Sequence, residues 1–260
     1  MTEHDDKPIG RVLSRREVLA LLGSAGVALL GSAFAFGNRD LVGAMQATPT
    51  AQPSATPDST PTCIARPQLT EGPYFVENMP ERYDIRADSR TGALSEGTPL
   101  FLRFVVATVS AAACLPLAGA RVDVWHCDAR GVYSGVRDAR FDTRGQDFLR
   151  GYQLTDRYGI ADFLTVYPGW YSGRAVHIHF KIRTQPQAAR GHEFTSQLFF
   201  DEAVNAAVYQ NKPYAARGLA NVPNAHDGIY RNGGAQLTLK PSLQADGSYV
   251  AVFNIGLDIR

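Results

Sequence analysis

Short β-prone runs separated by turn residues are the feature that most limits how this chain can fold. Leu100 to Val109 is rich in Val, Phe and Leu, and Ala120 to His126 alternates side chains with the period of two that a strand requires. A short helix is expected from Glu202 to Gln210, with Asp201 as its N-cap. Further strands are expected at 151–154, 160–166, 177–182, 196–200, 235–239 and 249–257. This pattern predicts an all-β fold, an antiparallel β-sandwich with a short helix and long loops.

The N-terminal part of the chain has the composition of an export segment. Arg15 and Arg16 precede an uncharged stretch rich in Gly and Ala from Val18 to Phe36, which is typical of a twin-arginine signal. An uncleaved membrane anchor has the same composition and stays open as an alternative. Residues 46–62 are almost wholly Ala, Thr, Pro, Ser and Gln, which cannot bury a core. We therefore expect export by the twin-arginine translocase to a secreted, cell-surface or periplasmic location, with a signal or anchor at 1–45, a linker at 46–62 and a catalytic domain at 63–260.

Charge and cysteine content narrow the class of protein further. The chain has 26 Lys and Arg against 25 Asp and Glu, a formal net charge of +1, which argues against a nucleic-acid-binding surface. Its three cysteines are Cys63, Cys114 and Cys127, and none has a zinc-site spacing. An exported domain permits disulfides. The preferred pair is Cys114 with Cys127, which flank one predicted strand, and Cys63 with either partner is the alternative.

His177 and His179 are the strongest indication of chemistry. Residues two apart on a strand point to the same face, so both imidazoles can bind one metal ion. Such a pair alone is more often structural or a zinc or copper site, and cupins also use it, but no glutamate follows His179 at the cupin spacing. Tyr171 lies just before the pair, and Tyr133 follows the strand that ends at His126. Two phenolates with two imidazoles favour Fe(III), because only a strongly Lewis-acidic cation keeps a phenol ionised.

Five motifs lie at 70–75, 125–133, 168–171, 174–180 and 197–200. In their order and spacing they resemble those of the intradiol ring-cleavage dioxygenases. The resemblance extends from about Cys63 to Leu257. It implies non-haem ferric iron held by Tyr171 and His177 as axial ligands and by Tyr133 and His179 as equatorial ligands.

The resemblance also implies an activity, with a catechol and O₂ as partners. A catechol bound through both oxygens displaces Tyr171, O₂ attacks the activated ring, and hydrolysis releases a cis,cis-muconate-type dicarboxylate. Arg174 stands where the family has an arginine that stabilises negative charge on the ring, and Gln197 matches a glutamine of the same pocket. Tyr74 is a weaker candidate for the pocket wall. Export suggests plant- or lignin-derived catechols, and the particular catechol stays open.

A non-catalytic exported β-sandwich is the alternative function. Residues 114–124 and the turn at 155–163 resemble transthyretin-like and carboxypeptidase-regulatory modules, and a carbohydrate-binding domain is a second possibility. The ligand set discriminates between these classes, because a binding module does not need two tyrosines and two histidines at one point. Of the other histidines, His126 is expected to be structural or to lie behind the ligands, and His192 and His226 are expected to be solvated.

Overall fold

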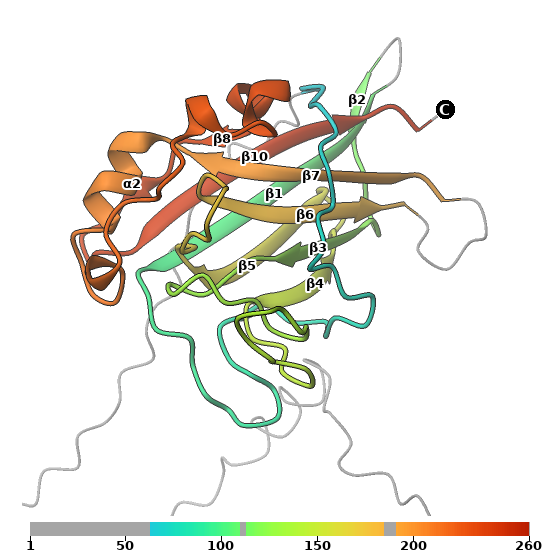
Figure 1. Ribbon diagram of the computed structural model, residues 1–260. Helices are drawn as coiled ribbons and strands as arrows, with labels where there is room; N and C mark the ends of the chain where they lie inside the picture. Colours follow the sequence, from blue (N-terminus) through green and yellow to red (C-terminus); the bar gives the residue numbers. More distant parts are fainter. Residues whose placement is uncertain (1–62, 110–112, 185–190, 260) are drawn as a thin grey trace, which may run out of the picture. The chain divides into compact units, whose positions relative to one another are not determined.

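The computed structural model describes residues 63–109, 113–184 and 191–259 (Figure 1). They belong to one unit that spans Thr56–Arg260. The expected signal and the linker before Cys63 lie outside the described residues. Within the described ranges, no helix is long and apolar enough to cross a membrane.

Two five-stranded sheets pack face to face and form the body of this unit (Figure 1). The first sheet has the order β2-β1-β10-β9, with β5 also paired to β1, and the second has the order β4-β3-β6-β7-β8. The strands are β1 Pro99–Val109, β2 Cys114–Pro116, β3 Arg121–Trp125, β4 Arg150–Leu154, β5 Ile160–Val166, β6 His177–Arg183, β7 Glu193–Phe200, β8 Thr238–Leu239, β9 Ser242–Leu243 and β10 Tyr249–Leu257. The helices are α2 Glu202–Val208 and the short 3₁₀ helices η1 Tyr214–Ala216, η2 Asn224–His226, η3 Tyr230–Asn232 and η4 Gly234–Leu237.

The predicted all-β sandwich with one short helix is confirmed, and its sheets are mixed rather than purely antiparallel. β1 pairs with β10 in parallel, which is possible because no short hairpin joins these two strands. The helix α2 begins after Asp201, whose side chain accepts a hydrogen bond from the Ala203 amide at 2.8 Å, as expected of an N-cap. The strand expected at 235–239 is mostly η4, because Gly233, with φ of 120°, turns the chain before it.

The apolar core lies between the two sheets. On β6, Phe180 packs against Phe104 and Phe253 of the first sheet, with ring centroids 5.3 Å away from each. All three side chains are buried. Because side chains alternate along a strand, His177 and His179 point to the outer face of the second sheet, away from this core.

An extended segment crosses that outer face before the first strand begins. This N-terminal strap, residues 63–80, runs over the second sheet (cyan in Figure 1). The Leu69 amide donates to the Thr195 carbonyl at 3.1 Å, and the Ser196 hydroxyl donates to the Pro67 carbonyl at 2.9 Å, so the strap is fastened to β7. The strap therefore covers the face on which the two histidines lie.

A disulfide ties the start of the strap to the first sheet. It joins Cys63 to Cys114, whose Cα atoms lie 5.5 Å apart. The preferred Cys114–Cys127 pair was therefore wrong, and one of the open alternatives is correct. Cys114 begins β2 in the first sheet, whereas Cys127 follows β3 in the second sheet and is a buried free thiol. Although β2 and β3 are consecutive in the sequence, they belong to different sheets, so flanking β3 does not bring Cys114 and Cys127 together.

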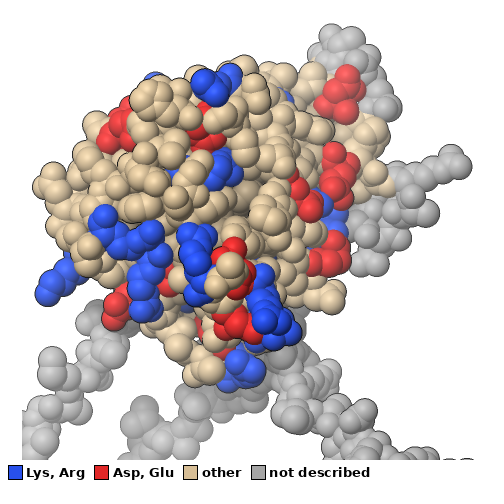
Figure 2. Space-filling view, in the orientation of Figure 1, with Lys and Arg blue, Asp and Glu red and all other residues tan. Residues whose placement is uncertain are grey.

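Charged side chains of both signs lie in patches on the visible face of the molecule, most of which is uncharged (Figure 2). Figure 2 shows basic side chains gathered on its lower part, with acidic side chains among them and along the right edge. Close ion pairs join residues two apart in sequence, such as Arg144 with Asp142 at 2.6 Å and Arg86 with Asp84 at 2.8 Å. Much of this surface charge is therefore paired locally.

Candidate functional site

One row of paired residues brings side chains from four strands together on the outer face of the second sheet. Arg150 lies opposite Trp125, Trp125 opposite His179, and His179 opposite Gln197. Residues that lie directly opposite share a face of the sheet. The Trp125 indole stacks on the His179 imidazole with centroids 5.0 Å apart and an interplanar angle of 9°. This row fixes the plane of the His179 ring and sets the predicted Gln197 beside it.

The predicted histidine pair is brought together and kept neutral. The Nε2 atoms of His177 and His179 lie 3.0 Å apart, and both side chains are buried. Nδ1 of His177 lies 2.7 Å from the Ala175 carbonyl oxygen, which accepts its hydrogen bond and leaves a lone pair on Nε2. Burial, with the Arg174 charge nearby, lowers the pKa of His177 to about 3. Burial likewise lowers the pKa of His179 well below its ordinary value, so both rings have the neutral form that binds metals.

The two predicted tyrosines join the cluster from loops. The Tyr171 hydroxyl lies 3.3 Å from Nε2 of His177. The Tyr133 ring centroid lies 5.7 Å from that of Tyr171 and 6.1 Å from that of His179. Burial raises the pKa of Tyr171 to about 12 and that of Tyr133 well above its ordinary value. The Tyr133 hydroxyl is buried and has no hydrogen-bond partner among the described residues, which costs about 1–3 kcal/mol unless a ligand satisfies it.

This donor set fits a hard, strongly Lewis-acidic cation. Among the described residues, no three His, Cys, Asp or Glu side chains gather in a way that could hold a metal ion. The phenols of Tyr133 and Tyr171 are the further oxygen donors that lie against the histidine pair. Because burial favours the protonated form of both phenols, only a cation that strongly favours anionic oxygen would ionise them. The orphaned hydroxyl of Tyr133 and the free lone pair of His177 fit Fe(III) in this respect.

Arg174 lies beside the cluster and is held from two sides. Its Nη2 donates to Oε1 of Gln197 at 2.5 Å, and its Nε donates to Oδ2 of Asp227 at 2.8 Å. Its Nη1 lies 3.4 Å from the Tyr171 hydroxyl. The Gln197 amide donates in turn to the Thr70 carbonyl of the strap at 2.7 Å. The structure thus brings the predicted Arg174 and Gln197 to the same place as the histidines.

Asp227 is the residue of this network that sequence reasoning missed. It lies 53 positions after Arg174 in a polar loop, next to the exposed His226. Neither periodicity nor motif spacing distinguishes it from the other acidic residues of surface loops. Only its complete burial, with a side chain that is 0% exposed, marks it in the structure.

Tyr74 of the strap forms part of the cover over the cluster. Its ring stacks on Tyr133 with centroids 4.4 Å apart and an interplanar angle of 25°, and it meets the Tyr171 ring edge-on at 5.9 Å. Its hydroxyl donates to Asp138 Oδ2 at 2.6 Å. Tyr74 therefore lies against both predicted tyrosine ligands, where a wall of the site would be.

The strap also closes over His179. Gly72 has φ of 75°, and a Cβ there would come within 3.1 Å of the His179 Cε1 atom, so the backbone approaches the ring closely. Lys181 lies two residues after His179 on the same face. Its ammonium forms an ion pair with Glu71 at 2.5 Å and contacts the Phe75 ring at 4.2 Å from its centroid. These contacts fix the strap above the cluster.

The other histidines of the described residues are not part of the cluster. His126 is buried, with Nε2 2.7 Å from the Thr165 hydroxyl and Nδ1 2.8 Å from the Cys127 carbonyl oxygen. Both of its nitrogens are thus already engaged, as suits a structural residue. His192 and His226 are exposed.

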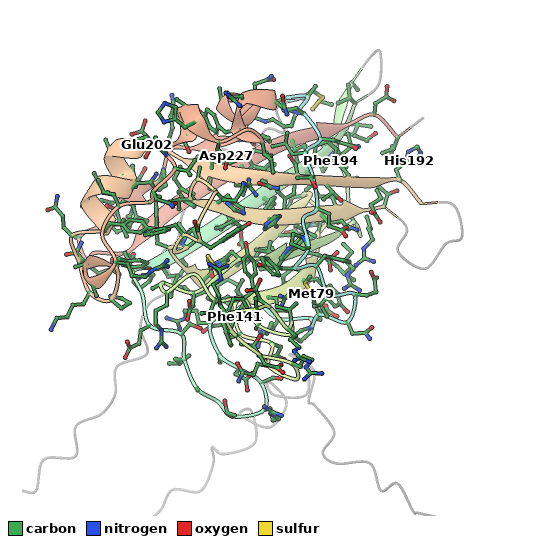
Figure 3. All side chains as sticks on the ribbon, viewed as in Figure 1. Met79, Phe141, His192, Phe194, Glu202 and Asp227 are labelled. Carbon is green, nitrogen blue, oxygen red and sulfur yellow. A yellow bond between two sulfur atoms is a disulfide. The ribbon has the colours of Figure 1, made fainter. Side chains whose placement is uncertain are left out.

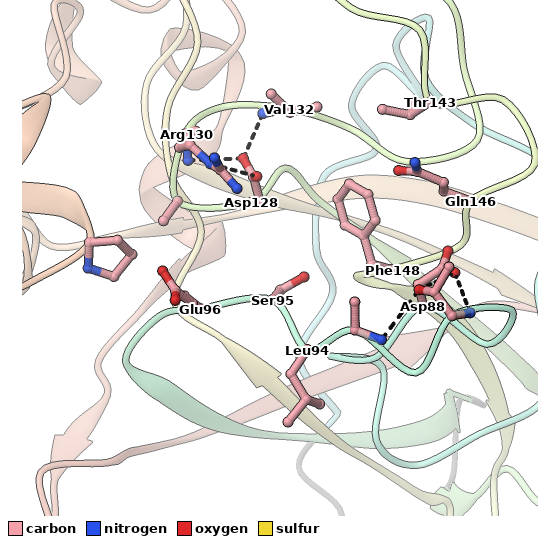
Figure 4. Close-up of a pocket in the computed structure, with 14 residues that line it drawn as sticks. Asp88, Leu94, Ser95, Glu96, Asp128, Arg130, Val132, Thr143, Gln146 and Phe148 are labelled. Atoms are coloured by element: carbon pink, nitrogen blue, oxygen red, sulfur yellow. Dashed lines mark hydrogen bonds and ion pairs between the residues drawn. The ribbon is translucent and has the colours of Figure 1, made fainter.

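A separate hollow of about 670 Å³ is lined by the loop that carries Tyr133 (Figure 4). Val132, Thr143 and the acidic Asp88 and Asp128 line it, and none of the four candidate metal ligands does. The Thr143 hydroxyl donates to the Tyr133 carbonyl at 2.6 Å. The hollow therefore borders the backbone of this loop rather than the donor cluster itself.

Comparisons with known proteins identify the family of the chain. The family model described as Dioxygenase matches residues 70–211, which is more than half of the 260-residue chain and includes all four candidate ligands. A chlorocatechol 1,2-dioxygenase of Pseudomonas putida is 30% identical over 150 residues, covering 50% of this chain and 52% of that protein. A catechol 1,2-dioxygenase of Acinetobacter baylyi is 27% identical over 175 residues, covering 59% and 51%. The chain thus spans about half the length of these curated relatives.

Solved structures match more of the chain. An intradiol ring-cleavage dioxygenase from Tetranychus urticae is 28% identical with a TM-score of 0.64, covering 76% of this chain and 95% of that one. The dioxygenase domain of a dioxygenase–carbohydrate-binding protein fusion from Streptomyces sp. SirexAA-E is 25% identical with a TM-score of 0.52, covering 76% and 100%. By its matched family model, its relatives and its fold, the chain belongs to the intradiol ring-cleavage dioxygenase family.

Proposed function

We propose that this protein is an Fe(III)-dependent intradiol dioxygenase that cleaves a catechol-type ring between its two hydroxylated carbons. The observation that carries the proposal is the convergence of Tyr133, Tyr171, His177 and His179 at one buried point. The chlorocatechol and catechol 1,2-dioxygenases to which the chain is similar support a catechol as the class of substrate. A non-catalytic module would have no use for this donor set.

In the proposed reaction the ring carbon–carbon bond breaks and both atoms of O₂ enter the product, a cis,cis-muconate-type dicarboxylate. The four electrons come from the catechol, so no further reductant is needed. Ferric iron held by the two tyrosines and two histidines would supply the Lewis acidity that makes the catechol ring reactive toward O₂. The side chains around this point bind the substrate, exclude water and stabilise charge.

Residues around the donor cluster have distinct proposed roles. Tyr171, if the iron held it as a phenolate, would take up a proton from a catechol hydroxyl. Nη1 of Arg174, 3.4 Å from that oxygen, is near enough to stabilise negative charge that develops on the ring. Gln197 holds the Arg174 guanidinium, and Tyr74 and Trp125 exclude water from the cluster.

The colour of the purified protein tests the metal. We expect a broad visible tyrosinate-to-iron charge-transfer band that shifts when a catechol is added without oxygen. With isotope-labelled O₂, the dicarboxylate product is expected to contain both labelled oxygen atoms. A colourless protein with zinc at full occupancy, or a product with one labelled atom, would contradict the proposal.

Tyr133→Phe tests the ligand assignment. We expect weaker iron retention and an altered visible band, because the orphaned hydroxyl is the proposed donor. Tyr209→Phe is the matched control, since Tyr209 is also buried but its hydroxyl donates to the Pro168 carbonyl at 2.8 Å. An unaltered spectrum of Tyr133→Phe would remove this residue from the ligand set.

We further propose that the protein works outside the cytoplasm after export through the twin-arginine translocase. The Arg15-Arg16 pair supports this, and so does the Cys63–Cys114 disulfide, because disulfides persist in oxidising compartments. Plant- or lignin-derived catechols are then the proposed substrates. Replacing both arginines with lysine is expected to retain the protein in the cytoplasm, and unchanged export would contradict this route.

A further inference from the structure

The Arg174 guanidinium is held in one orientation by groups from different parts of the fold. Gln197 on β7 accepts from Nη2, and Asp227 in the turn between η2 and η3 accepts from Nε. Arg174 itself lies in the short turn after Tyr171, where its amide donates to the Tyr171 carbonyl at 3.3 Å. With Nε and Nη2 engaged, the Nη1 corner of the planar group is directed toward the Tyr171 hydroxyl.

Asp227 is built into the fold as an acceptor. Oδ2 accepts from Arg174 Nε and from the Ala175 amide, both at 2.8 Å. Oδ1 accepts from the amides of Ile229 at 2.7 Å and Tyr230 at 3.1 Å. Burial opposes the charged form, but the Ala175 amide, the Arg174 charge and the Tyr230 amide outweigh it and keep the pKa of Asp227 below its ordinary value. The carboxylate is therefore charged and fully engaged.

The turn that carries Asp227 is itself anchored to the second sheet. Figure 3 labels Asp227 and Glu202. The Asn224 side chain donates to the Phe200 carbonyl at 2.7 Å, at the end of β7. The Asn224 amide donates to the Glu202 carboxylate at 2.6 Å, in the first turn of α2. Asp227 thus has a fixed position relative to β7, the strand that also carries Gln197.

We propose that Asp227 is a positioning residue for ring cleavage, which fixes the rotation of the Arg174 guanidinium so that its Nη1 corner faces the substrate. This inference rests on the proposed dioxygenase function. Gln197 alone does not fix the rotation, because one neutral contact at Nη2 leaves the planar group free to turn about that contact. The charged Asp227 carboxylate at Nε supplies a second contact. Together with the contact at Nη2, it fixes the orientation of the planar guanidinium.

Orientation matters here because a donor stabilises developing charge only when it is already aimed at the charge. A displacement of about 1 Å can cost on the order of 100-fold in rate. Among the residues that the structure describes, Asp227 is the carboxylate that forms an ion pair with Arg174. Its loss would leave the guanidinium charged but poorly aimed.

Asp227→Asn separates this role from the structural one. An asparagine can keep Oδ1 toward the Ile229 and Tyr230 amides, so the turn retains its hydrogen bonds. Its Nδ2 donor would then face Arg174 Nε and the Ala175 amide, which are also donors. We expect kcat to fall roughly 10- to 100-fold. We expect the affinity for a catechol, measured without oxygen, to change less than about threefold. Iron content and the visible band should be unchanged. The reason is that Asp227 helps to stabilise charge that develops only after the catechol has bound.

A double-mutant cycle with Arg174→Ala tests whether Asp227 acts through the arginine. In the Arg174→Ala background, adding Asp227→Asn is expected to change kcat less than about twofold, because residues that act as one unit are not additive. Asp88→Asn is the matched control, since Asp88 is also buried and also accepts backbone amides, but contacts no residue of the candidate site. It is expected to leave kcat unchanged.

The outcomes distinguish this inference from the proposed function. A wild-type protein that cleaves no catechol would overturn the function and the inference with it. A wild-type protein that cleaves catechol, with Asp227→Asn equally active or additive with Arg174→Ala, would overturn the inference alone. Asp227→Ser serves as a second variant. If neither variant folds, as judged by thermal unfolding, Asp227 is a structural residue and the inference is wrong.

Discussion

The two faces of β6 are both buried, but different interactions stabilise them. The face toward the core carries Ile178, Phe180 and Ile182, each in contact with apolar side chains. The outer face carries His177 and His179, which are just as inaccessible to water but polar. Nδ1 of His179 has no hydrogen-bond partner among the described residues. Apolar burial thus stabilises one face, whereas the other contains buried polar groups that the protein leaves partly unsatisfied.

This difference predicts that stability and function separate along a single strand. The outer face is kept dry by its cover, which includes the strap and the Arg174–Asp227 pair, rather than by a second sheet. Substitutions on the core side should therefore change the free energy of unfolding. Substitutions on the outer side should mainly change iron binding and activity.

Phe180→Ala is expected to have the largest effect on the core face. Removing a buried phenylalanine leaves a cavity between Phe104 and Phe253 and should lower the free energy of unfolding by about 3–5 kcal/mol. Urea unfolding of the metal-free protein measures this loss. The fraction that remains folded should still bind iron with an unchanged visible band. A loss below about 1 kcal/mol would show that the core face does not carry the stability of this strand.

His179→Ala, one residue away on the opposite face, is expected to abolish most activity while changing stability little. Activity should fall at least about 100-fold. Mutating even a residue that only hydrogen-bonds to a metal ligand lowers metal affinity or activity about 10- to 100-fold. The free energy of unfolding of the metal-free protein should change by less than about 2 kcal/mol, because the cavity is offset by removal of an unsatisfied nitrogen. His192→Ala, at an exposed position, is the control. Retained iron in His179→Ala would exclude this residue as a ligand.

Sequence periodicity was sufficient for the parts of the fold that depend on one strand at a time. It predicted that His177 and His179 share a face, and it predicted most strands of both sheets within a few residues. It could not predict which strands pair. The parallel pairing of β1 with β10 and the Cys63–Cys114 disulfide both depend on contacts between distant segments.

The candidate site was predictable to the extent that a family motif carried it. Arg174 and Gln197 were assigned by resemblance, and the structure supplies the reason for their proximity, because Gln197 lies opposite His179 in the register of β6 and β7. Asp227 had no such signal. A buried carboxylate in a polar loop looks like any surface residue until the loop is folded onto β7.

Acid should weaken the outer face before the core. The pKa of Asp227 in the folded protein lies below its unfolded value of ~3.9, so its carboxylate stabilises the fold fully above about pH 4 and loses this effect as pH falls through the folded pKa. Asp227→Asn should therefore be less stable than wild type by about 1.5–3 kcal/mol at pH 7. The difference should shrink below pH 4 in unfolding measurements. A difference that is constant from pH 7 to pH 3 would show that the charge of Asp227 contributes nothing.

Lys181→Met is expected to have the smallest effect on stability. Its ammonium lies between Glu71 at 2.5 Å and Glu193 at 2.7 Å, and both carboxylates are partly exposed to water. An isosteric apolar side chain should change the free energy of unfolding by less than about 1 kcal/mol, because replacing a desolvated ion pair is often neutral.

The same substitution should nevertheless loosen the cover, because Glu71 precedes Gly72, whose backbone lies against His179. Weakening the closed strap by up to about 1 kcal/mol raises its open fraction up to about fivefold, and iron loss to a chelator should accelerate by the same factor. Arg144→Met, which breaks an exposed ion pair with Asp142, is the control and should not change that rate. If iron leaves the Lys181→Met variant at the wild-type rate, opening of the strap does not control iron loss from the outer face. The difference between the two faces of β6 would then come from the proposed metal ligands and not from the strap that covers them.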